Sequence, residues 1–323
     1  MANEMDDLFN GGLDSKMDFL NEVKSSNNND GIYRVDLKLA KDEKKGWRSV
    51  VRFLPNLTQE GKIGQSAIEK ISHYVDIKSA KELSGWFDSA KNFNEKCALT
   101  DLYYQMQNSK NAVLIEKSKQ LKFSKKYYSY VLVLEDEQQP ELVGNIMVFQ
   151  YVKTIKDKIM AEKNGEISGV PANVFDLSSG KDFVMIVKEI STGDETYPDY
   201  KMSMFKSETT SLPIYFKEKG VFKNAPLNGE GKIDASVQGK IKDFLTERDH
   251  NLEDFAPKKL TEEQQVKITD ITNYLTGKAA SSFTNKTESK PSSDDFSFEE
   301  NFTNNPVATS NVSESEDDFF ADL

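Results

Sequence analysis

The sequence contains little cysteine, little histidine and no long apolar run. Among its 323 residues there is one cysteine, Cys97, and there are two histidines, His73 and His250. A single thiol cannot build an internal disulfide framework, and His73 and Cys97 are too few for structural zinc, which needs four ligands. No run of about 18 apolar residues is present, so no transmembrane helix is predicted. The acidic N-terminus also lacks the pattern of a signal peptide, and we therefore expect a cytoplasmic protein.

Motifs typical of enzymes are scarce as well. The two histidines lie in different segments, so they support no Ser/His/Asp arrangement, and GEGK at 229–232 lacks the spacing of a phosphate-binding loop. Carboxylates are many, but none group at the spacing of a metal site. We expect a protein that is not an enzyme and uses no cofactor, with a metal-dependent nuclease as a disfavoured alternative.

The chain carries more negative than positive charge overall, but the excess of negative charge lies at its two ends. The formal net charge is -11, from 42 Lys and Arg against 53 Asp and Glu. Residues 1–30 hold seven acids and two lysines, and residues 279–323 hold ten acids and two lysines, so the segment between them is nearly neutral. An anionic polymer responds to the local field rather than to the total charge. The acidic total therefore does not exclude a nucleic-acid ligand.

Composition divides the chain into four parts. Residues 1–30 are expected to form an N-terminal arm, and residues 31–250 a folded core. Residues 251–278 are expected to form a helical linker. Residues 279–323 are rich in Ser, Thr, Asn and acids and poor in aliphatic residues, which is typical of a disordered tail.

Hydrophobic patterning indicates the fold class. Runs of β-branched and aromatic residues predict strands at 47–55, 70–78, 127–134, 144–152, 182–190 and 200–205. Helices are predicted at 154–163, within 89–107, at 234–248 and at 261–277. The last of these has a capping box at Thr261 and Gln264 and ends at Gly277. The pattern is typical of a mainly β fold with added helices, an α+β class, built on a small antiparallel barrel or sandwich.

The most informative segment is EKSKQLKFSKKYYSYVLVL, residues 116–134, in which lysines alternate with aromatic residues. In a strand, one face would hold Tyr128, Tyr130, Leu132 and Leu134, and the other Tyr127, Ser129, Val131 and Val133. Lysines bind phosphates, and aromatic faces stack on unpaired bases at roughly 1–3 kcal/mol per base without reading sequence. The same residues also fit a lysine-rich loop beside an ordinary strand, and both interpretations are open at this point.

Two other segments repeat this theme. MVFQYVK at 147–153 places Phe149, Tyr151 and Lys153 on one strand face, with the two rings about 7 Å apart. These rings either stack on neighbouring bases or belong to the core. YPDY at 197–200 adds Tyr197 and Tyr200 beside a proline turn.

The order and spacing of these segments resemble a known family. WRSVVRFLPN, KFSKKYYSYVLVLED, GNIMVFQYVKTIKDKI, a second strand at 183–188 and the acidic tail follow one another as in the T-even-type phage single-stranded DNA-binding, helix-destabilising proteins. The resemblance covers roughly residues 45–205 together with the tail. It implies an OB-fold-like core, cooperative binding of single strands, and a tail that contacts proteins of DNA replication, recombination and repair.

The resemblance also implies DNA-binding roles for particular residues. It places Arg52, Lys122, Lys125 and Lys126 along the phosphate path, and Lys153 shares the face of the second aromatic pair. The stacking candidates are Tyr127, Tyr128, Phe149, Tyr151, Tyr197 and Tyr200.

Two departures from the family pattern affect what the resemblance implies. The family holds zinc with one histidine and three cysteines, but here only His73 and Cys97 match, and Thr100 stands where the C-x-x-C partner would be. We expect that zinc is absent and that apolar packing around Trp86, Phe87 and Phe93 replaces it. The family's N-terminal arm is basic whereas this one is acidic, so self-association on DNA either uses another contact, the Leu13, Met17 and Leu20 face, or is weak.

The chain ends in SESEDDFFADL, where acids surround two phenylalanines. We predict that the acids compete with DNA for the basic groove and that Phe319, Phe320 and Leu323, with Asp317 and Asp318, bind partner proteins. The alternative prediction for the whole chain is a virion scaffolding or structural protein whose acidic arms serve assembly.

Overall fold

The structure is a computed structural model that describes residues 31–35, 46–58, 61–167, 169–192, 195–216, 219–248 and 250–277. The predicted N-terminal arm and acidic tail lie outside these residues. So do the self-association face at Leu13, Met17 and Leu20 and the partner-binding residues Asp317, Asp318, Phe319, Phe320 and Leu323.

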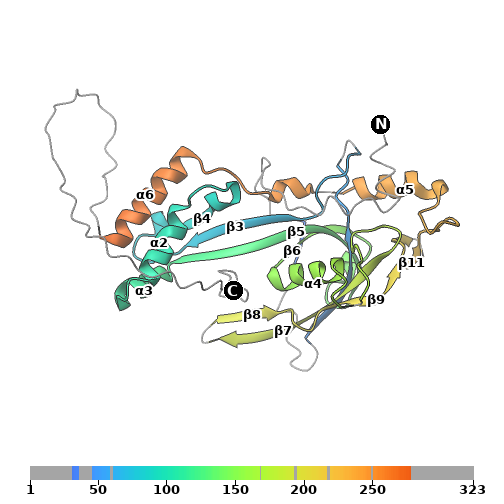
Figure 1. The fold of residues 1–323 in the computed structure, drawn as a ribbon, viewed down its shortest axis with the longest axis horizontal. Coiled ribbons are helices and arrows are strands. Elements are labelled where there is room, and N and C mark those ends of the chain that lie inside the picture. The colour runs from blue at the N-terminus through green and yellow to red at the C-terminus, as the bar shows by residue number, and fades with distance from the viewer. Residues whose placement is uncertain are drawn as a thin grey trace.

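A large mixed sheet dominates the described part of the chain (Figure 1). Its main path runs β1-β6-β5-β2-β7-β8, with β3 pairing β5 and β4, and β9 pairing β7. The strands are β1 (Ile32–Tyr33), β2 (Trp47–Leu54), β3 (Ile68–Val75), β4 (Gly85–Asp88), β5 (Leu121–Asp136), β6 (Ile146–Tyr151), β7 (Gly180–Thr192), β8 (Glu195–Asp199) and β9 (Met204–Thr210). A separate hairpin consists of β10 (Pro213–Phe216) and β11 (Val221–Asn224).

Five α-helices accompany the strands in the described ranges. They are α2 (Ala98–Gln107), α3 (Ala112–Ser118), α4 (Lys153–Lys163), α5 (Ala235–Thr246) and α6 (Glu262–Thr276). The predicted capping box starts α6, where the Thr261 hydroxyl accepts from the Gln264 amide and the Gln264 side chain accepts from the Thr261 amide, and Gly277 ends the helix in the left-handed region. Helices α2, α3 and α6 gather at one end of the molecule, and α5 lies at the other (Figure 1).

The long strand β5 belongs to two cores. Its predicted faces are confirmed, because Tyr128, Tyr130, Leu132 and Leu134 pack into one apolar cluster. The opposite face, with Tyr127, Val131 and Val133, packs into a second cluster. A strand buried on both faces favours apolar side chains, which explains the run toward residue 134, and the buried Ser129 hydroxyl is satisfied by the Tyr151 hydroxyl at 2.9 Å.

Helix α6 is part of the folded core, although the sequence suggested a linker. Ile268, Ile271 and Leu275 pack with residues of α2, β3 and β4 in a third apolar cluster. Lys267, in the middle of the helix, donates to the Ser84 carbonyl, and Lys117 donates to the Leu275 carbonyl near its C-terminal end. Residues 262–276 therefore close the end of the core that carries β3 and β4.

The α+β class with a large, mainly β sheet is confirmed, whereas a closed barrel is not. Within the described residues the pairing path ends at β1 on one side and at β8 on the other, so it does not close. The predicted strand at 200–205 begins only at Met204, and the predicted proline turn at 197–200 lies largely in strand β8, where Pro198 faces Glu189 of β7. Proline is tolerated there because β8 is an edge strand.

Candidate nucleic-acid interface

The candidate site begins where β5 leaves the two cores. Residues 121–126 of β5 pair only with β3, from Lys70 opposite Lys126 to Val75 opposite Leu121, and pairing with β6 begins at Tyr127. Without a second layer on both faces, the side chains of residues 122–126 are exposed or half-buried. Alternation along this stretch puts Lys122, Ser124 and Lys126 on one face.

An aromatic cavity of about 510 Å³ lies beside this half of β5. Its walls come from β3, β4, α2, β5 and β8. The rings that line it are Tyr74, Trp86, Tyr103, Phe123 and Tyr197, and the lysines are Lys119, Lys122 and Lys126. Trp86 is 63% exposed, and its ring lies 4.8 Å from that of Tyr74, centroid to centroid. A large exposed indole supported by a second ring offers a free face to a planar ligand.

A polar cavity of about 730 Å³ adjoins the aromatic cavity. The two share Trp86, Ser124 and Lys126, so they form one continuous groove across β3, β4 and β5. The other cations that line the polar cavity are Arg34, Lys70 and Lys258, and its other rings are Tyr128 and Phe255. The acids in its wall are Asp88 and Asp254.

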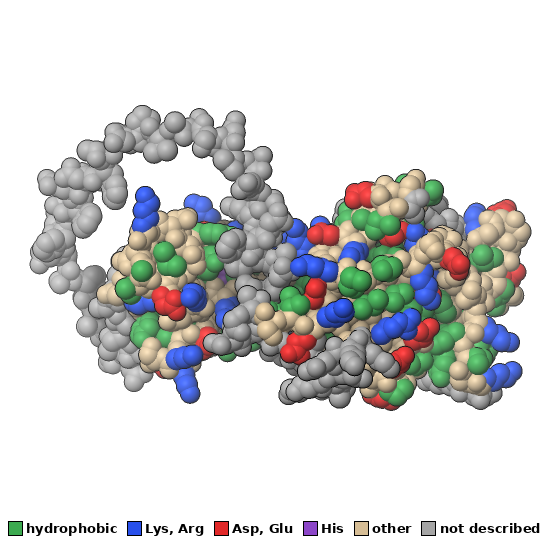
Figure 2. All heavy atoms as spheres, turned by 90° about the horizontal axis from the view of Figure 1, so that it is seen from below, with side chains coloured by type: hydrophobic (Ala, Val, Ile, Leu, Met, Phe, Trp, Pro, Cys, Tyr) green, Lys and Arg blue, Asp and Glu red, His purple; other side chains and the backbone are tan. Residues whose placement is uncertain are grey.

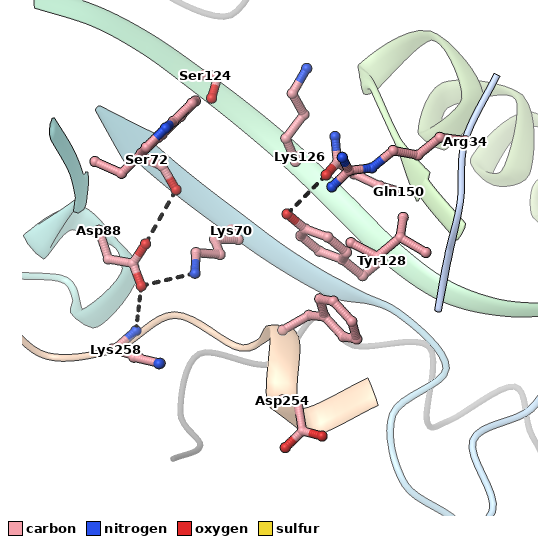
Figure 3. Close-up of a pocket in the computed structure, with 13 residues that line it drawn as sticks. Arg34, Lys70, Ser72, Asp88, Ser124, Lys126, Tyr128, Gln150, Asp254 and Lys258 are labelled. Atoms are coloured by element: carbon pink, nitrogen blue, oxygen red, sulfur yellow. Dashed lines mark hydrogen bonds and ion pairs between the residues drawn. The ribbon is translucent and has the colours of Figure 1, made fainter. Parts of the chain in front are cut away.

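Asp88 organises one side of the polar cavity (Figure 3). Its carboxylate accepts from the Lys70 ammonium at 3.0 Å, the Ser72 hydroxyl at 3.3 Å and the Lys258 amide at 2.7 Å. On the other side, the Tyr128 hydroxyl donates to Gln150, and Arg34 reaches toward the same amide from a separate segment. On one side of the cavity the charge of Lys70 is therefore neutralised by Asp88. On the other side the cations outnumber the acids.

Lys126 lies on the cation-rich side. Burial, and secondarily the positive charge of Arg34, lower the pKa of Lys126. Both effects disfavour the protonated amine in the absence of an anion, so a phosphate that entered here would be favoured electrostatically. Elsewhere the surface is mixed: Figure 2 shows Lys and Arg side chains spread among hydrophobic ones on one face of the molecule.

The groove brings together four of the residues that the sequence predicted as DNA-binding. Lys122, Lys126, Tyr128 and Tyr197 line one or both cavities, although they come from β5 and the distant β8. Lys122, Lys126 and Tyr197 lie together as phosphate binding combined with base stacking requires. The Tyr128 ring lines the groove but is only 8% exposed and stacks on Phe255.

Four predicted stacking residues are core residues, and the prediction is wrong for them. Phe149 is 0% exposed, and Tyr127 and Tyr151 stack on each other with ring centroids 5.7 Å apart in the same buried cluster. The predicted face of β6 is real, but α4 and β2 cover it, so its rings have no free face for a base. Tyr200 is buried in that cluster as well.

Arg52 is also misassigned, because its guanidinium is entirely used inside the protein. The side chain is buried and donates to the Asp182 carboxylate, to the Thr210 hydroxyl and carbonyl, and to the Asp176 carbonyl. A buried ion pair with this many hydrogen bonds joins β2 to β7 and β9 and keeps the guanidinium out of reach of a phosphate, because the side chain is 1% exposed.

Two predicted lysines lie outside the groove. Lys125 points to the opposite face of β5 and pairs with Glu69 at 3.0 Å. Lys153 begins α4, and its Nζ lies 3.9 Å from the Asp157 carboxylate one turn further along the helix. Neither lines a cavity, because alternation along β5 and the turn after β6 direct them elsewhere.

Sequence reasoning missed several residues that line the groove. The main ones are Tyr74, Trp86, Tyr103, Phe123, Arg34, Lys70 and Lys258. The pattern GWFD at 85–88 could have signalled Trp86, since a tryptophan in a four-residue strand two residues before an acid is an unusual surface feature. The cations were not recognisable, because charged residues are frequent along the chain and nothing in their own segments marks Arg34, Lys70 and Lys258.

The residues around His73 and Cys97 do not fit a structural zinc ion. The His73 Nε2 lies 3.4 Å from the Cys97 sulfur and 3.0 Å from the Thr100 hydroxyl. No group of three or more Cys, His, Asp and Glu side chains with metal-site geometry occurs in the described ranges. The remaining groups near Cys97 are hydroxyls, which are not structural zinc ligands. Trp86 takes no part in the packing expected to replace the metal, since its ring is exposed.

Comparison with protein families identifies the family of the chain. Residues 45–272 match the model of a family described as gp32 DNA binding protein like. The chain belongs to this family. A comparison with curated proteins found no match.

Family membership confirms the resemblance to the T-even-type single-stranded DNA-binding proteins, and it makes DNA a partner of this protein. The matched region contains every groove residue named above except Arg34, so the groove is a property of the family region. Of the helices in the described part of the chain, none has both the length and the apolar character that crossing a bilayer requires.

Proposed function

We propose that this protein binds single-stranded DNA without regard to sequence, as a non-enzymatic, helix-destabilising protein that supports phage replication, recombination and repair in the host cytoplasm. The observation that carries the proposal is the groove, in which exposed rings and cations converge from β3, β4, β5, α2 and β8. The family match supports this function over that of a virion scaffold.

Stacking accounts for the lack of sequence preference. Every base has a π-face, so Trp86 and Tyr74 can accept any base at roughly 1–3 kcal/mol per stacked base. In a duplex the same faces are covered by neighbouring bases, and the groove therefore discriminates against paired DNA.

Cations supply the remaining affinity. Lys122 and Lys126 on β5 and Lys258 in the wall of the polar cavity neutralise successive phosphates and release counterions. Binding to single strands alone shifts the melting equilibrium of DNA by mass action, so the proposed activity needs no catalytic residue.

The test is a fluorescence-anisotropy titration with labelled oligo-dT and a matched duplex, at about 50 mM and about 500 mM salt. We expect tight binding to the single strand, weak binding to the duplex and a steep loss of affinity with salt. Equal affinity for both DNA forms, or affinity independent of salt, would exclude the proposed function.

We further propose that the protein works without zinc. Support comes from the buried contacts of His73 with Cys97 and Thr100, which already join β3 to α2. Incubation with a chelator should leave both the melting temperature and the affinity for oligo-dT unchanged, whereas a drop in either would show that a metal is needed.

The OB-fold-like core remains part of this proposal. It is supported by the position of β2 between β5 and β7 and by the bulge at Val50 and Val51, since bulges bend strands at barrel corners.

The acidic tail is proposed to compete with DNA for the groove and to recruit partner proteins. Deletion of residues 313–323 should tighten binding to oligo-dT at low salt and abolish recruitment. An unchanged affinity at low salt would contradict the competition.

A further inference from the structure

A short strap before the family-matched region enters the groove. Residues 31–35 form the strand β1 and its flanks, and β1 pairs in parallel with β6, with Ile32 opposite Val148 and Tyr33 opposite Phe149. The family match begins only at residue 45, so this strap is not part of it.

Successive side chains of the strap point to opposite sides, so one side faces the groove and the other faces the core. Ile32 and Arg34 point to the polar cavity and line it. Tyr33 points to the opposite side, is 0% exposed and packs edge-on against Phe149 at a ring distance of 5.9 Å. The buried tyrosine therefore anchors the strap, and the arginine next to it faces the groove.

The anchor is held by a carboxylate that is itself fixed. The Tyr33 hydroxyl donates to Asp136 at 2.5 Å, and the other oxygen of Asp136 accepts from the amides of Gln138 and Gln139. The Gln139 side chain in turn donates to the Arg34 carbonyl at 3.5 Å. The turn after β5 thus holds both the ring and the backbone of the strap.

The start of the strap is equally constrained. Gly31 adopts a φ of +91°, and the Val148 amide donates to its carbonyl. A Cβ at position 31 would lie 1.7 Å from the His250 ring, so only glycine fits there. A backbone fixed at both ends sets the direction in which Arg34 leaves it.

We propose that the strap is a working part of the DNA site, in which Arg34 and Lys126 form a two-cation seat for one backbone phosphate and the Tyr33–Asp136 hydrogen bond positions Arg34. The proposal rests on the proposed function, because its ligand is the DNA backbone. Figure 3 shows Arg34 reaching into the cavity from its own segment toward Gln150 and Tyr128. Lys126 comes from β5, so the seat exists only when the strap is docked.

The charge environment fits a phosphate. Burial and Arg34 are the two causes that lower the pKa of Lys126, and no carboxylate contributes to the shift. Two acids line the cavity, Asp88 and Asp254, and Asp88 is already engaged with Lys70, Ser72 and the Lys258 amide. A phosphate between Arg34 and Lys126 would relieve the repulsion between the two cations.

The experiment is a double-mutant cycle with Arg34→Gln and Tyr33→Phe in the full chain, read by oligo-dT anisotropy over a salt series. Arg34→Gln should weaken binding about 5–10-fold at about 50 mM salt and reduce the log-log salt slope by about 0.7, the loss of one phosphate contact. Tyr33→Phe should weaken binding less, and it should add nothing when Arg34 is already replaced. The melting temperature should fall by the same amount with Tyr33→Phe in either background.

Arg48→Gln is the matched control, since Arg48 is exposed, pairs with Glu135 and lies outside both cavities. An unchanged salt slope in Arg34→Gln, or additive losses in the double variant, would overturn the strap proposal. Failure of the wild-type protein to prefer oligo-dT would instead overturn the proposed function, so the two failures are distinguishable. If Tyr33→Phe does not fold, the slope of Arg34→Gln, a groove-facing change outside the core, still decides the outcome.

Discussion

The described part of the molecule contains two groups of aromatic rings that look alike in sequence, one packed inside the core and one lining a cavity at the surface. The core ring cluster surrounds Phe53, with Phe149, Tyr151, Phe175, Phe183 and Phe205 at centroid distances of 5.7–6.2 Å. The aromatic cavity holds Tyr74, Trp86, Tyr103, Phe123 and Tyr197. Both groups lie on or beside sheet strands. Only the first is covered by a second layer, which includes α4 and the segment at 174–175.

Both groups consist of residues that are able to stack. Whether a second layer of the protein covers a ring decides whether it packs against other rings or is open to a ligand. In the core ring cluster each ring meets another ring edge-on or tilted, and the gain is stability. In the aromatic cavity the indole of Trp86 has one ring behind it and open space in front. Stability and ligand binding should therefore be separable by mutation.

The largest effect is expected from the core ring cluster. Phe149→Ala should lower the free energy of unfolding by about 3–5 kcal/mol, because it removes a fully buried ring and leaves a cavity. The folded fraction should still bind oligo-dT with wild-type affinity. Chemical denaturation measures the first quantity and anisotropy below the melting temperature the second. Val113→Ala, at an exposed site on α3, is the control for apolar truncation, and a selective loss of DNA affinity in Phe149→Ala would restore its predicted stacking role.

The opposite result is expected in the aromatic cavity. Trp86→Ala should cost about 1–3 kcal/mol of binding to oligo-dT, through loss of one stacked base, with little change in stability. Trp86→Phe should retain part of the affinity. The only other tryptophan, Trp47, is buried in the core, so quenching of tryptophan fluorescence by DNA should disappear in Trp86→Phe. Persistent quenching in that variant would show that Trp86 does not contact bases.

Removing a cation should change the salt dependence rather than the stacking. Lys126→Gln should lower the log-log salt slope by about 0.7, whereas Trp86→Ala should leave the slope intact. Lys240→Gln is the matched control, since Lys240 is exposed on α5 and lines neither cavity. An equal change of slope in both lysine variants would mean that the charge effect is not specific to the groove.

The smallest effect should have the opposite sign. Asp88→Asn removes a negative charge from the polar cavity and releases Lys70, so affinity for oligo-dT at low salt should rise by the equivalent of about 0.2–1 kcal/mol. Glu135→Gln, which breaks the exposed Arg48 pair, should leave affinity unchanged. A fall in affinity of Asp88→Asn would indicate that the carboxylate is needed to hold β3 against β4.

Much of the fold could be predicted from local patterns. The alternation in residues 127–134 predicted both faces of β5, and the capping box predicted the start of α6, because both depend on backbone periodicity and neighbouring side chains alone. The strand β4 was missed because four residues are too short for a periodic signal. The barrel was not confirmed, because closure depends on pairing between strands far apart in the chain.

The candidate site was predictable only in part. Lys122, Lys126, Tyr128 and Tyr197 lie in the groove as the sequence suggested. Phe149, Tyr151 and Arg52 have the same residue types in similar strands but are covered. Nothing in their own segments distinguishes them, because the covering layer comes from elsewhere in the chain.

The sequence by itself determined the family, the longer strands, the faces of β5 and the concentration of lysine and aromatic residues beside them, since these follow from residue order and spacing. The tertiary structure alone decided which rings are free. It also decided that Arg34, Trp86 and Tyr197 share one groove. The strap at 31–35 and the strands β4 and β8 that carry these residues are far apart in the sequence and come together only after the sheet has formed.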